Sequence, residues 1–206
     1  MILSSALNKT LPWPPTSRVL ELGELHLERL GAPYGFRLKD CMANQFQSWV
    51  TVDLGSGSDD VENVDLAEPA PNWNKQYDII IDGGTVEHVE PATGQYQCWS
   101  NIHEWLALNG MAILTVAEPG TWPNHCRYRY PREFFDSFER IGYGVHYEAI
   151  TFPCSSSDNL FVILTKMREE VFMTEHKFWE LVDYDNSPIT PHGNYPKGKN
   201  NYIKTQ

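Results

Sequence analysis

The sequence predicts an α/β fold: a doubly wound, seven-stranded and mostly parallel sheet with a C-terminal extension. Strand-like and helix-like segments alternate through most of the chain, which is typical of such a sheet. The segment YDIIID at residues 77–82 carries a continuous β-branched run, as a central strand buried on both faces requires. Two late strand-like segments, residues 144–152 and 160–166, are separated only by a turn-rich stretch and indicate a hairpin-like pair at a sheet edge.

The remaining elements follow from apolar spacing and from turn residues. Further strands are expected over residues 18–22, 49–54, 61–66 (a shorter and weaker pattern) and 111–116. Helices are expected near residues 36–46, over 95–108, after Pro131 and over 169–182. Asn109-Gly110 is predicted to end the second of these helices, and Gly142 the third. The chain divides into an N-terminal segment (1–17), one domain (18–166) and a C-terminal helix with an irregular tail (167–206).

Composition excludes several classes of function. The chain has 206 residues, 41% of them hydrophobic, which suits one domain with a sizeable core. Its formal net charge of −11 argues against broad nucleic-acid binding and against binding to an anionic membrane. No apolar run has the length of a signal peptide or a membrane span, and the 4 cysteines are widely spaced. We therefore expect a cytoplasmic protein, either a monomer or a homodimer.

Two glycine-containing stretches compete for the role of the loop after the first strand. VDLGSGSDD, at residues 52–60, looks like a phosphate-binding loop, but too few residues separate Asp53 from Asp65 for a helical crossover, which needs about a dozen or more. RVLELG, at residues 18–23, is followed by enough residues for a loop and a helix. The first strand is therefore RVLEL, and Asp53 ends the second. An acid at that position can accept hydrogen bonds from both hydroxyls of a ribose.

The ordered set of VLELG, VDLG, VDLAEP, YDIIIDGGTVEHV, LNGMAILTV and HCRYRYPREFF resembles the class I S-adenosylmethionine-dependent methyltransferases. It looks closest to a group of methyltransferase-domain proteins with a GT-x-EHV motif after the fourth strand. The resemblance covers roughly residues 18–165 and implies a Rossmann-like methyltransferase fold. It also implies S-adenosyl-L-methionine as the cofactor and an unidentified small-molecule oxygen or nitrogen acceptor as the partner.

The resemblance assigns cofactor-binding roles to matching positions of this chain. Glu21 and Gly23 would approach the methionine part, Asp53 the ribose and Asp65 with Leu66 the adenine; Asp82, Gly83 and Gly84 would lie beside the methionine and sulfonium. The usual first motif has two more glycines soon after the first, whereas Glu24-Leu25-His26-Leu27 follow Gly23 here, and Gly31 and Gly35 come later. The cofactor loop is therefore enlarged or rebuilt, which leaves a catalytically degenerate binding module as the alternative. A nicotinamide-linked reductase fits less well, because the GxGxxG fingerprint is missing after the first strand.

Two histidines are the candidate catalytic residues. His88 lies just past the fourth strand and His125 follows the fifth; imidazole, with an unperturbed pKa of about 6.5, is a suitable general base. The alternative for His88 is a structural role, in which its side chain forms a hydrogen bond with the backbone at the start of a helix. Glu87 is assigned an orienting role on the substrate side.

The segment HCRYRYPR concentrates three arginines in an acidic protein. Arg127, Tyr128 and Arg129 are candidate substrate-binding residues, because guanidinium groups hold a carboxylate or phosphate by forked hydrogen bonds. The alternative is a solvated rim paired with acids such as Glu133 and Asp136. The 7 histidines show no metal-ligand spacing along the sequence, so no metal is predicted.

Overall fold

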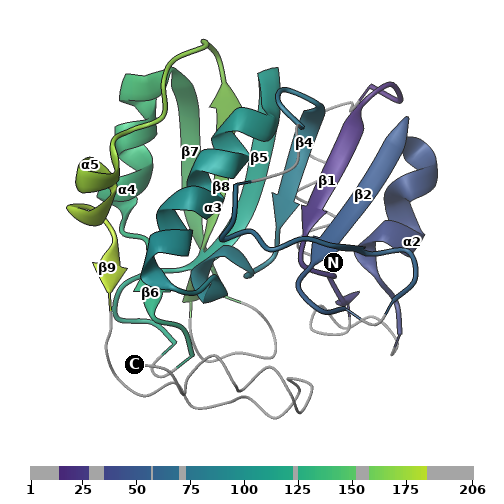
Figure 1. Cartoon of the computed structure of the whole chain (residues 1–206), viewed down its shortest axis with the longest axis horizontal. Helices are drawn as coiled ribbons and strands as arrows, with labels where there is room; N and C mark the ends of the chain where they lie inside the picture. Colours follow the sequence, from purple (N-terminus) through teal and green to yellow (C-terminus); the bar gives the residue numbers. More distant parts are fainter. Residues whose placement is uncertain are drawn as a thin grey trace.

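The computed structural model of the chain describes residues 14–27, 35–56, 58–69, 73–122, 125–151 and 158–184. Its main sheet has seven strands in the order β3-β2-β1-β4-β5-β8-β7 (Figure 1). These are β1 (Arg18–Leu22), β2 (Ser48–Asp53), β3 (Glu62–Asn63), β4 (Tyr77–Asp82), β5 (Leu106–Ala117), β7 (Tyr143–Thr151) and β8 (Asp158–Lys166). β1 to β5 pair in parallel, whereas β8 is antiparallel to both β5 and β7. The predicted doubly wound, mostly parallel sheet with a final antiparallel pair is confirmed.

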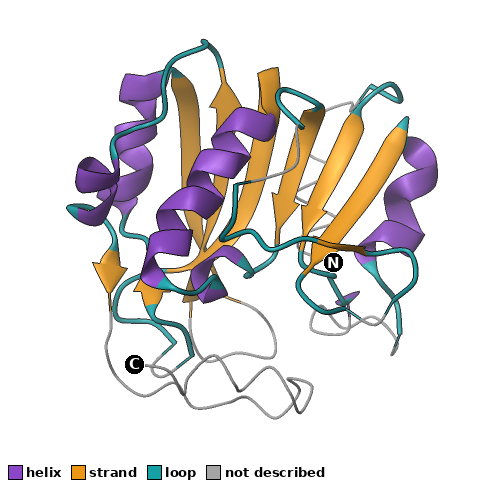
Figure 2. Cartoon of the chain, in the orientation of Figure 1, coloured by secondary structure: helices purple, strands orange, loops and turns teal. Residues whose placement is uncertain are grey.

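Helices cover both faces of this sheet. They are α2 (Leu38–Met42) with the 3-10 turn η2 (Ala43–Gln45), α3 (Ala92–Trp105), α4 (Arg132–Asp136) with the 3-10 turn η4 (Ser137–Ile141), and α5 (Glu175–Trp179). Successive residues of the central strands enter opposite layers: Leu20 and Ile80 pack with α3 and α4, whereas Val19 and Ile79 pack with α2. Figure 2 shows α3 and α4 crossing one face of the sheet. The described part of the chain contains no helix long and apolar enough to cross a membrane.

The boundary between α3 and β5 differs from the prediction. The helix expected over residues 95–108 ends at Trp105, and Asn109-Gly110 lie inside β5 rather than at a helix end. The physical reason is that Leu106 already pairs with β4, so the backbone is extended from there on. The left-handed conformation falls on Asn109, at φ 66, and the register between β4 and β5 shifts at this point.

The third strand is shorter than predicted. β3 comprises only Glu62–Asn63, so Asp65 and Leu66 lie in the loop after it. The amide of Asn101, on α3, donates to the carbonyl of Leu66 at 3.2 Å and to that of Glu68 at 2.9 Å. The side chain of Asn101 therefore holds this loop in place beyond the end of the short strand β3.

The C-terminal segment lies over the α3 and α4 face as a strap. The helix expected over 169–182 is confined to α5, and the chain then forms β9 (Asp183–Tyr184), which pairs with β6 (Tyr128–Arg129). Phe172 and Phe178 are buried in the larger core cluster. Parts of the predicted N-terminal segment (1–13) and tail (185–206) lie outside the described residues, as do Gly31, Gly57 and Cys154.

Candidate active site

The carboxyl ends of β1 and β4 approach each other closely. Gly23 follows β1 with φ +73, and its N–H donates to the carbonyl of Val52 at 2.7 Å. The hydroxyl of Thr85, beyond β4, donates to the carbonyl of Leu22 at 3.0 Å. A Cβ atom on Gly23 would lie 2.1 Å from Oγ1 of Thr85, so this position requires a glycine both for its conformation and for space.

Glu21, a predicted cofactor residue, has its carboxylate inside the fold. One oxygen accepts from the indole N–H of Trp49 at 2.9 Å and from the hydroxyl of Thr51 at 2.7 Å. The other accepts from the backbone N–H of Leu25 at 3.3 Å. Burial raises the pKa of Glu21, and these hydrogen bonds act in the opposite direction. In the described structure Glu21 therefore holds the start of the loop after Gly23.

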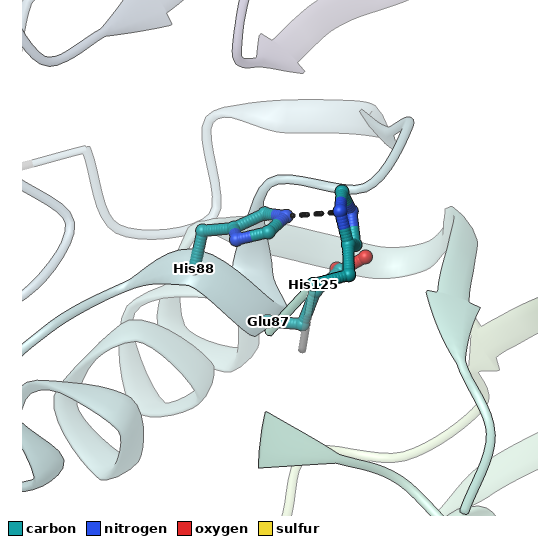
Figure 3. A group of neighbouring side chains, drawn as sticks. All are labelled: Glu87, His88 and His125. Carbon is teal, nitrogen blue, oxygen red and sulfur yellow. Dashed lines mark hydrogen bonds between the residues drawn. The ribbon is translucent and has the colours of Figure 1, made fainter. Parts of the chain in front are cut away.

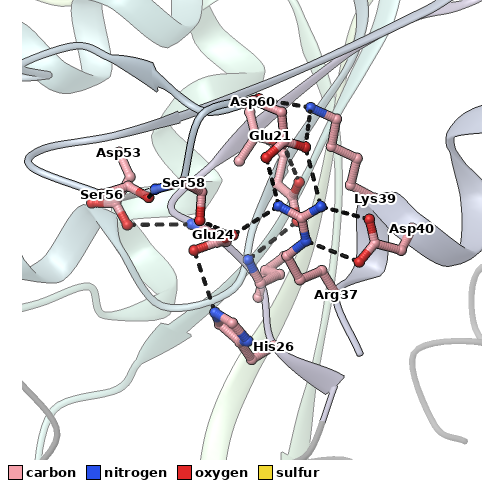
Figure 4. Close-up of polar contacts among 12 residues, drawn as sticks. Glu21, Glu24, His26, Arg37, Lys39, Asp40, Asp53, Ser56, Ser58 and Asp60 are labelled. Carbon is pink, nitrogen blue, oxygen red and sulfur yellow. Dashed lines mark hydrogen bonds and ion pairs between the residues drawn. The ribbon is translucent and has the colours of Figure 1, made fainter. Parts of the chain in front are cut away.

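That loop is fastened by Arg37 (Figure 4). The guanidinium contacts three carboxylates: Asp40 at 2.7 Å, Asp60 at 2.8 Å and Glu24 at 3.0 Å. Hydrogen bonds to these acids raise the pKa of Arg37. Because Asp60 belongs to the turn after β2, Arg37 connects the loop after β1 with that turn.

Asp53 lies at the end of β2, and Asp65 lies two residues beyond the end of the paired strand β3. Asp53 ends β2, is partly buried, and accepts from the backbone N–H of Glu24 at 3.5 Å. Asp65 follows β3 and accepts from the N–H of Ala67 at 2.9 Å. The adjacent residue, Leu66, is 7% exposed. Both carboxylates thus belong to segments at the carboxyl ends of two paired strands, the edge where ligands of open α/β sheets bind.

Asp82 organises the turn after β4. Its carboxylate accepts from the backbone N–H groups of Thr85 at 2.9 Å, Val86 at 3.3 Å and Gly84 at 3.4 Å. Burial raises its pKa to about 7, against these hydrogen bonds. Gly83 directly follows Asp82, and a Cβ atom on it would lie 1.9 Å from a methyl group of Leu25. The rebuilt loop after Gly23 therefore packs directly on this turn.

The two predicted catalytic histidines are brought together (Figure 3). His88 lies in the 3-10 turn η3 (Val86–His88), and its Nε2 is 3.2 Å from Nε2 of His125, which follows β5. Their rings are nearly perpendicular, at 85°. Glu87, beside them, is 4% exposed, and its Oε2 has no hydrogen-bond partner among the described residues. Burial raises the pKa of Glu87, and the nearby Asp82 acts in the same direction.

Residues that sequence reasoning did not select hold η3 in place. The amide of Gln95, on α3, donates to the carbonyls of Val86 at 2.7 Å and Val89 at 2.8 Å. The hydroxyl of Tyr130 donates to the side-chain oxygen of Gln95 at 2.5 Å. Gln95 lies on α3 and Tyr130 directly after β6, and no local pattern in the sequence distinguishes them from ordinary core residues.

The predicted acceptor-binding residues are engaged within the fold. Arg127 pairs with Glu90 at 3.1 Å, and the hydroxyl of Tyr128 donates to the same carboxylate at 2.9 Å. Arg129 is 4% exposed and donates to the carbonyls of Thr121 at 3.0 Å and Trp122 at 3.1 Å.

The ion pairs of Arg127 and Arg132 use Glu90 and Glu118 rather than the predicted Glu133 and Asp136. Arg132 pairs with Glu118 at 2.9 Å, and Asp136 accepts from the hydroxyl of Tyr147 at 3.0 Å. Because Tyr128 and Arg129 are buried with their polar groups bonded, we assign them to shaping the loop of His125.

The sequence matches no protein-family model and no curated protein sequence. The structure is similar to that of the Burkholderia thailandensis 1,6-didemethyltoxoflavin-N1-methyltransferase, solved with 1,6-didemethyltoxoflavin and S-adenosylhomocysteine bound: identity 16%, TM-score 0.54, over 81% of this chain and 76% of that one. A SAM-dependent methyltransferase from Archaeoglobus fulgidus is 15% identical, with a TM-score of 0.53 over 80% and 93% of the two chains. A TehB-like SAM-dependent methyltransferase from Corynebacterium glutamicum is 18% identical, with a TM-score of 0.52 over 79% and 86%. At these identities the similarity is one of fold.

Proposed function

We propose that this chain, which has the fold of the class I S-adenosylmethionine-dependent methyltransferases, binds S-adenosylmethionine and transfers its methyl group to a small-molecule oxygen or nitrogen acceptor. The observation that carries the proposal is the placement of Asp53 and Asp65 at the carboxyl ends of adjacent strands. The cofactor has a ribose diol, an adenine amino group and a positive charge. Carboxylates suit all three, because they accept hydrogen bonds and attract a cation.

In this proposal the residues of the chain divide into a cofactor side and an acceptor side. Asp53 would hold the ribose, the loop at Asp65 and Leu66 the adenine, and the backbone of Gly83 and Gly84 the methionine part. S-adenosylmethionine supplies the electrophilic methyl group when bound. The protein contributes alignment of the acceptor and exclusion of water, which are the main requirements of such a transfer.

The acceptor side centres on His88 and His125. With Nε2 atoms 3.2 Å apart, one ring can donate a hydrogen bond only while the other accepts it, so the two rings act as one unit in proton transfer. An acceptor hydroxyl or amine placed beside them could pass its proton to this pair. His88 of the GT-x-EHV motif and His125 of the loop after β5 would then act together as the general base.

The test is calorimetric titration of the folded chain with S-adenosylmethionine and S-adenosylhomocysteine. We expect Asp53→Ala to weaken binding by about tenfold or more, because hydrogen bonds to a charged group contribute about 1.5–3 kcal/mol. Asp59→Ala is the matched control: Asp59 is exposed in the turn that follows Asp53, so the variant changes the net charge equally. Equal weakening by both variants would refute the assignment of Asp53 to the ribose.

A second candidate function has an observation in its favour. Leu25 packs on Gly83, and the N–H of Glu24 points to Asp53, so the rebuilt loop already contacts two of the proposed cofactor residues. A methyltransferase-fold binding module that no longer takes the cofactor would have this arrangement. Absence of binding of either compound to the intact, folded chain would favour this module over the enzyme.

A further inference from the structure

Three groups that commonly bind metal ions converge at η3. The ligand atoms of Glu87, His88 and His125 all lie within 4.8 Å of one another. They come from two segments, because His125 is 37 residues from His88. We propose that this cluster is a binding site for one divalent transition-metal ion, held by the Glu87 carboxylate and by Nε2 of each histidine.

The distance between the two nitrogens fits a shared ion. Nitrogen ligands lie about 2.1 Å from zinc, so two of them at bond angles of 90–109° are roughly 3.0–3.4 Å apart. The observed separation of the two Nε2 atoms is 3.2 Å. The two rings meet edge to face, with centroids 4.7 Å apart and an angle of 85° between them, so the nitrogens can approach one ion without the rings stacking.

Glu87 provides an independent indication. It is 4% exposed, and Oε2 lacks a hydrogen-bond partner within the described part of the chain. A buried carboxylate oxygen left in this state costs free energy, whereas a bound cation would satisfy it. Figure 3 shows this carboxylate directed toward the ring of His125. A hydrogen bond between the two histidines explains their contact but gives no reason for the buried acid beside them.

The surrounding contacts hold the ligands in position, as the outer shell of a metal site does. Gln95 fixes η3, which carries Glu87 and His88. Arg129 fixes the loop of His125 through two carbonyls. Glu90, two residues after His88, pairs with Arg127, two residues after His125, and so connects the two segments.

The donor set indicates the kind of metal and its role. Two imidazoles and one carboxylate suit zinc, iron, cobalt or manganese better than magnesium or calcium, which prefer oxygen ligands throughout. Three protein ligands leave an open position on the ion. If the proposed methyl transfer holds, an acceptor hydroxyl bound there would lose its proton to water more readily, because the ion stabilises the anion, and the two histidines would act as ligands instead of as the base. The binding of metal itself does not depend on that function.

The experiment is titration of the chelator-treated full chain with Zn²⁺ by calorimetry and with Co²⁺ by absorption spectroscopy. We expect one ion per chain and a Co²⁺ ligand-field band. His88→Ala or His125→Ala removes a direct ligand and should weaken metal binding by at least about tenfold. Loss of a residue that only supports a ligand already weakens metal binding by about that factor. Glu87→Gln, of similar size, should alter the Co²⁺ band. His146→Ala, an exposed histidine on β7, is the control and should bind as the parent chain does.

Absence of binding to the folded parent chain would overturn the proposal, as would equal affinity in the parent and both histidine variants. Circular dichroism of each variant separates loss of a ligand from loss of the fold. The metal titration contains no methyl donor, and the cofactor titration with Asp53→Ala contains no metal. Failure of one proposal is therefore distinguishable from failure of the other.

Discussion

Gly23 and Gly35 both have left-handed backbone conformations, but their surroundings differ. Gly23 has φ +73 and faces Thr85, whereas Gly35 has φ +86 and open space where a Cβ would lie. Both belong to the loop that departs from the usual methyltransferase pattern. The comparison separates two reasons for a glycine, backbone conformation and close approach, within one short segment.

We predict that Gly23→Ala destabilises the chain more than Gly35→Ala. Gly35→Ala should cost about 1–2 kcal/mol, the penalty of the left-handed conformation alone. Gly23→Ala carries that penalty and also overpacks against Thr85, which adds about 1–3 kcal/mol. Urea unfolding of the two variants measures the difference. Equal losses of unfolding free energy would mean that Thr85 moves aside without cost.

At the scale of elements, the strap formed by residues 167–184 completes the core over α3 and α4. Phe178 is fully buried, and its ring lies 5.5 Å from Phe134 of α4 and 5.7 Å from Tyr96 of α3. Thr174 caps α5 by accepting from the N–H of Lys177. In the described structure the strap therefore covers apolar surface that the sheet and its helices would otherwise expose.

Phe178→Ala should lower the free energy of unfolding by about 3–5 kcal/mol, as expected for an aromatic side chain removed from a core. Val171→Ala, in the same strap but 86% exposed, should change it by less than about 0.5 kcal/mol. Chemical denaturation of both variants provides the measurement. A small effect of Phe178→Ala would show that the strap contributes little to stability.

The sequence predicted the elements with strong local patterns. The β-branched run of β4, the edge pair β7 and β8, and the helix ending at Gly142 are all found. The predicted end of α3 is wrong because the pairing of Leu106 with β4 ends the helix at Trp105. Such a tertiary contact is not visible in the local spacing of apolar residues.

The sequence indicates candidate site residues one by one, whereas the structure shows which of them lie together. The sequence indicates His88 and His125 separately, each from its place after a strand. Ligand spacing along the chain could not reveal the cluster, because sheet pairing and the loop after β5 bring His125 to η3. The buried environment of Glu87, likewise, depends on contacts between distant segments.

On the scale of the whole molecule, a buried polar network connects α3, β7, β8 and the strap. Nε2 of His103 bonds to the carbonyl of Glu170 at 2.9 Å, and Nδ1 lies 2.9 Å from the hydroxyl of Tyr143. The ammonium of Lys166, 1% exposed, donates to the carbonyls of His103 at 2.9 Å and Leu106 at 3.1 Å. Burial lowers the pKa of His103, and the charge of Lys166 lowers it further.

This network predicts a loss of stability in mild acid. Because the pKa of His103 is lower in the folded chain, the unfolded chain binds the proton first as pH falls below about 6.5. Stability should therefore be unaffected by His103 above that pH. Below it, the loss should reach up to about 1.4 kcal/mol per pH unit until the folded chain is protonated as well.

The measurement is urea unfolding of the parent chain, His103→Gln and His146→Gln between pH 7.5 and 5.5. His103→Gln should show a shallower fall in stability with decreasing pH, whereas His146→Gln, which changes an exposed histidine, should follow the parent. Parallel curves for the parent and His103→Gln would place the acid sensitivity elsewhere.

The pairing of β6 with β9 has a consequence for the order in which the molecule is assembled. The loop that carries His125 is anchored by β5 at one end and by β6 at the other, and β6 has its partner strand in residues 183–184. The stacking of Tyr128 on Tyr184 reinforces that anchor. During synthesis, the ribosome therefore releases all three proposed metal ligands before the segment that closes the loop of His125. Because this pairing restricts the loop within the fold itself, folding rather than binding bears the entropy of ordering His125.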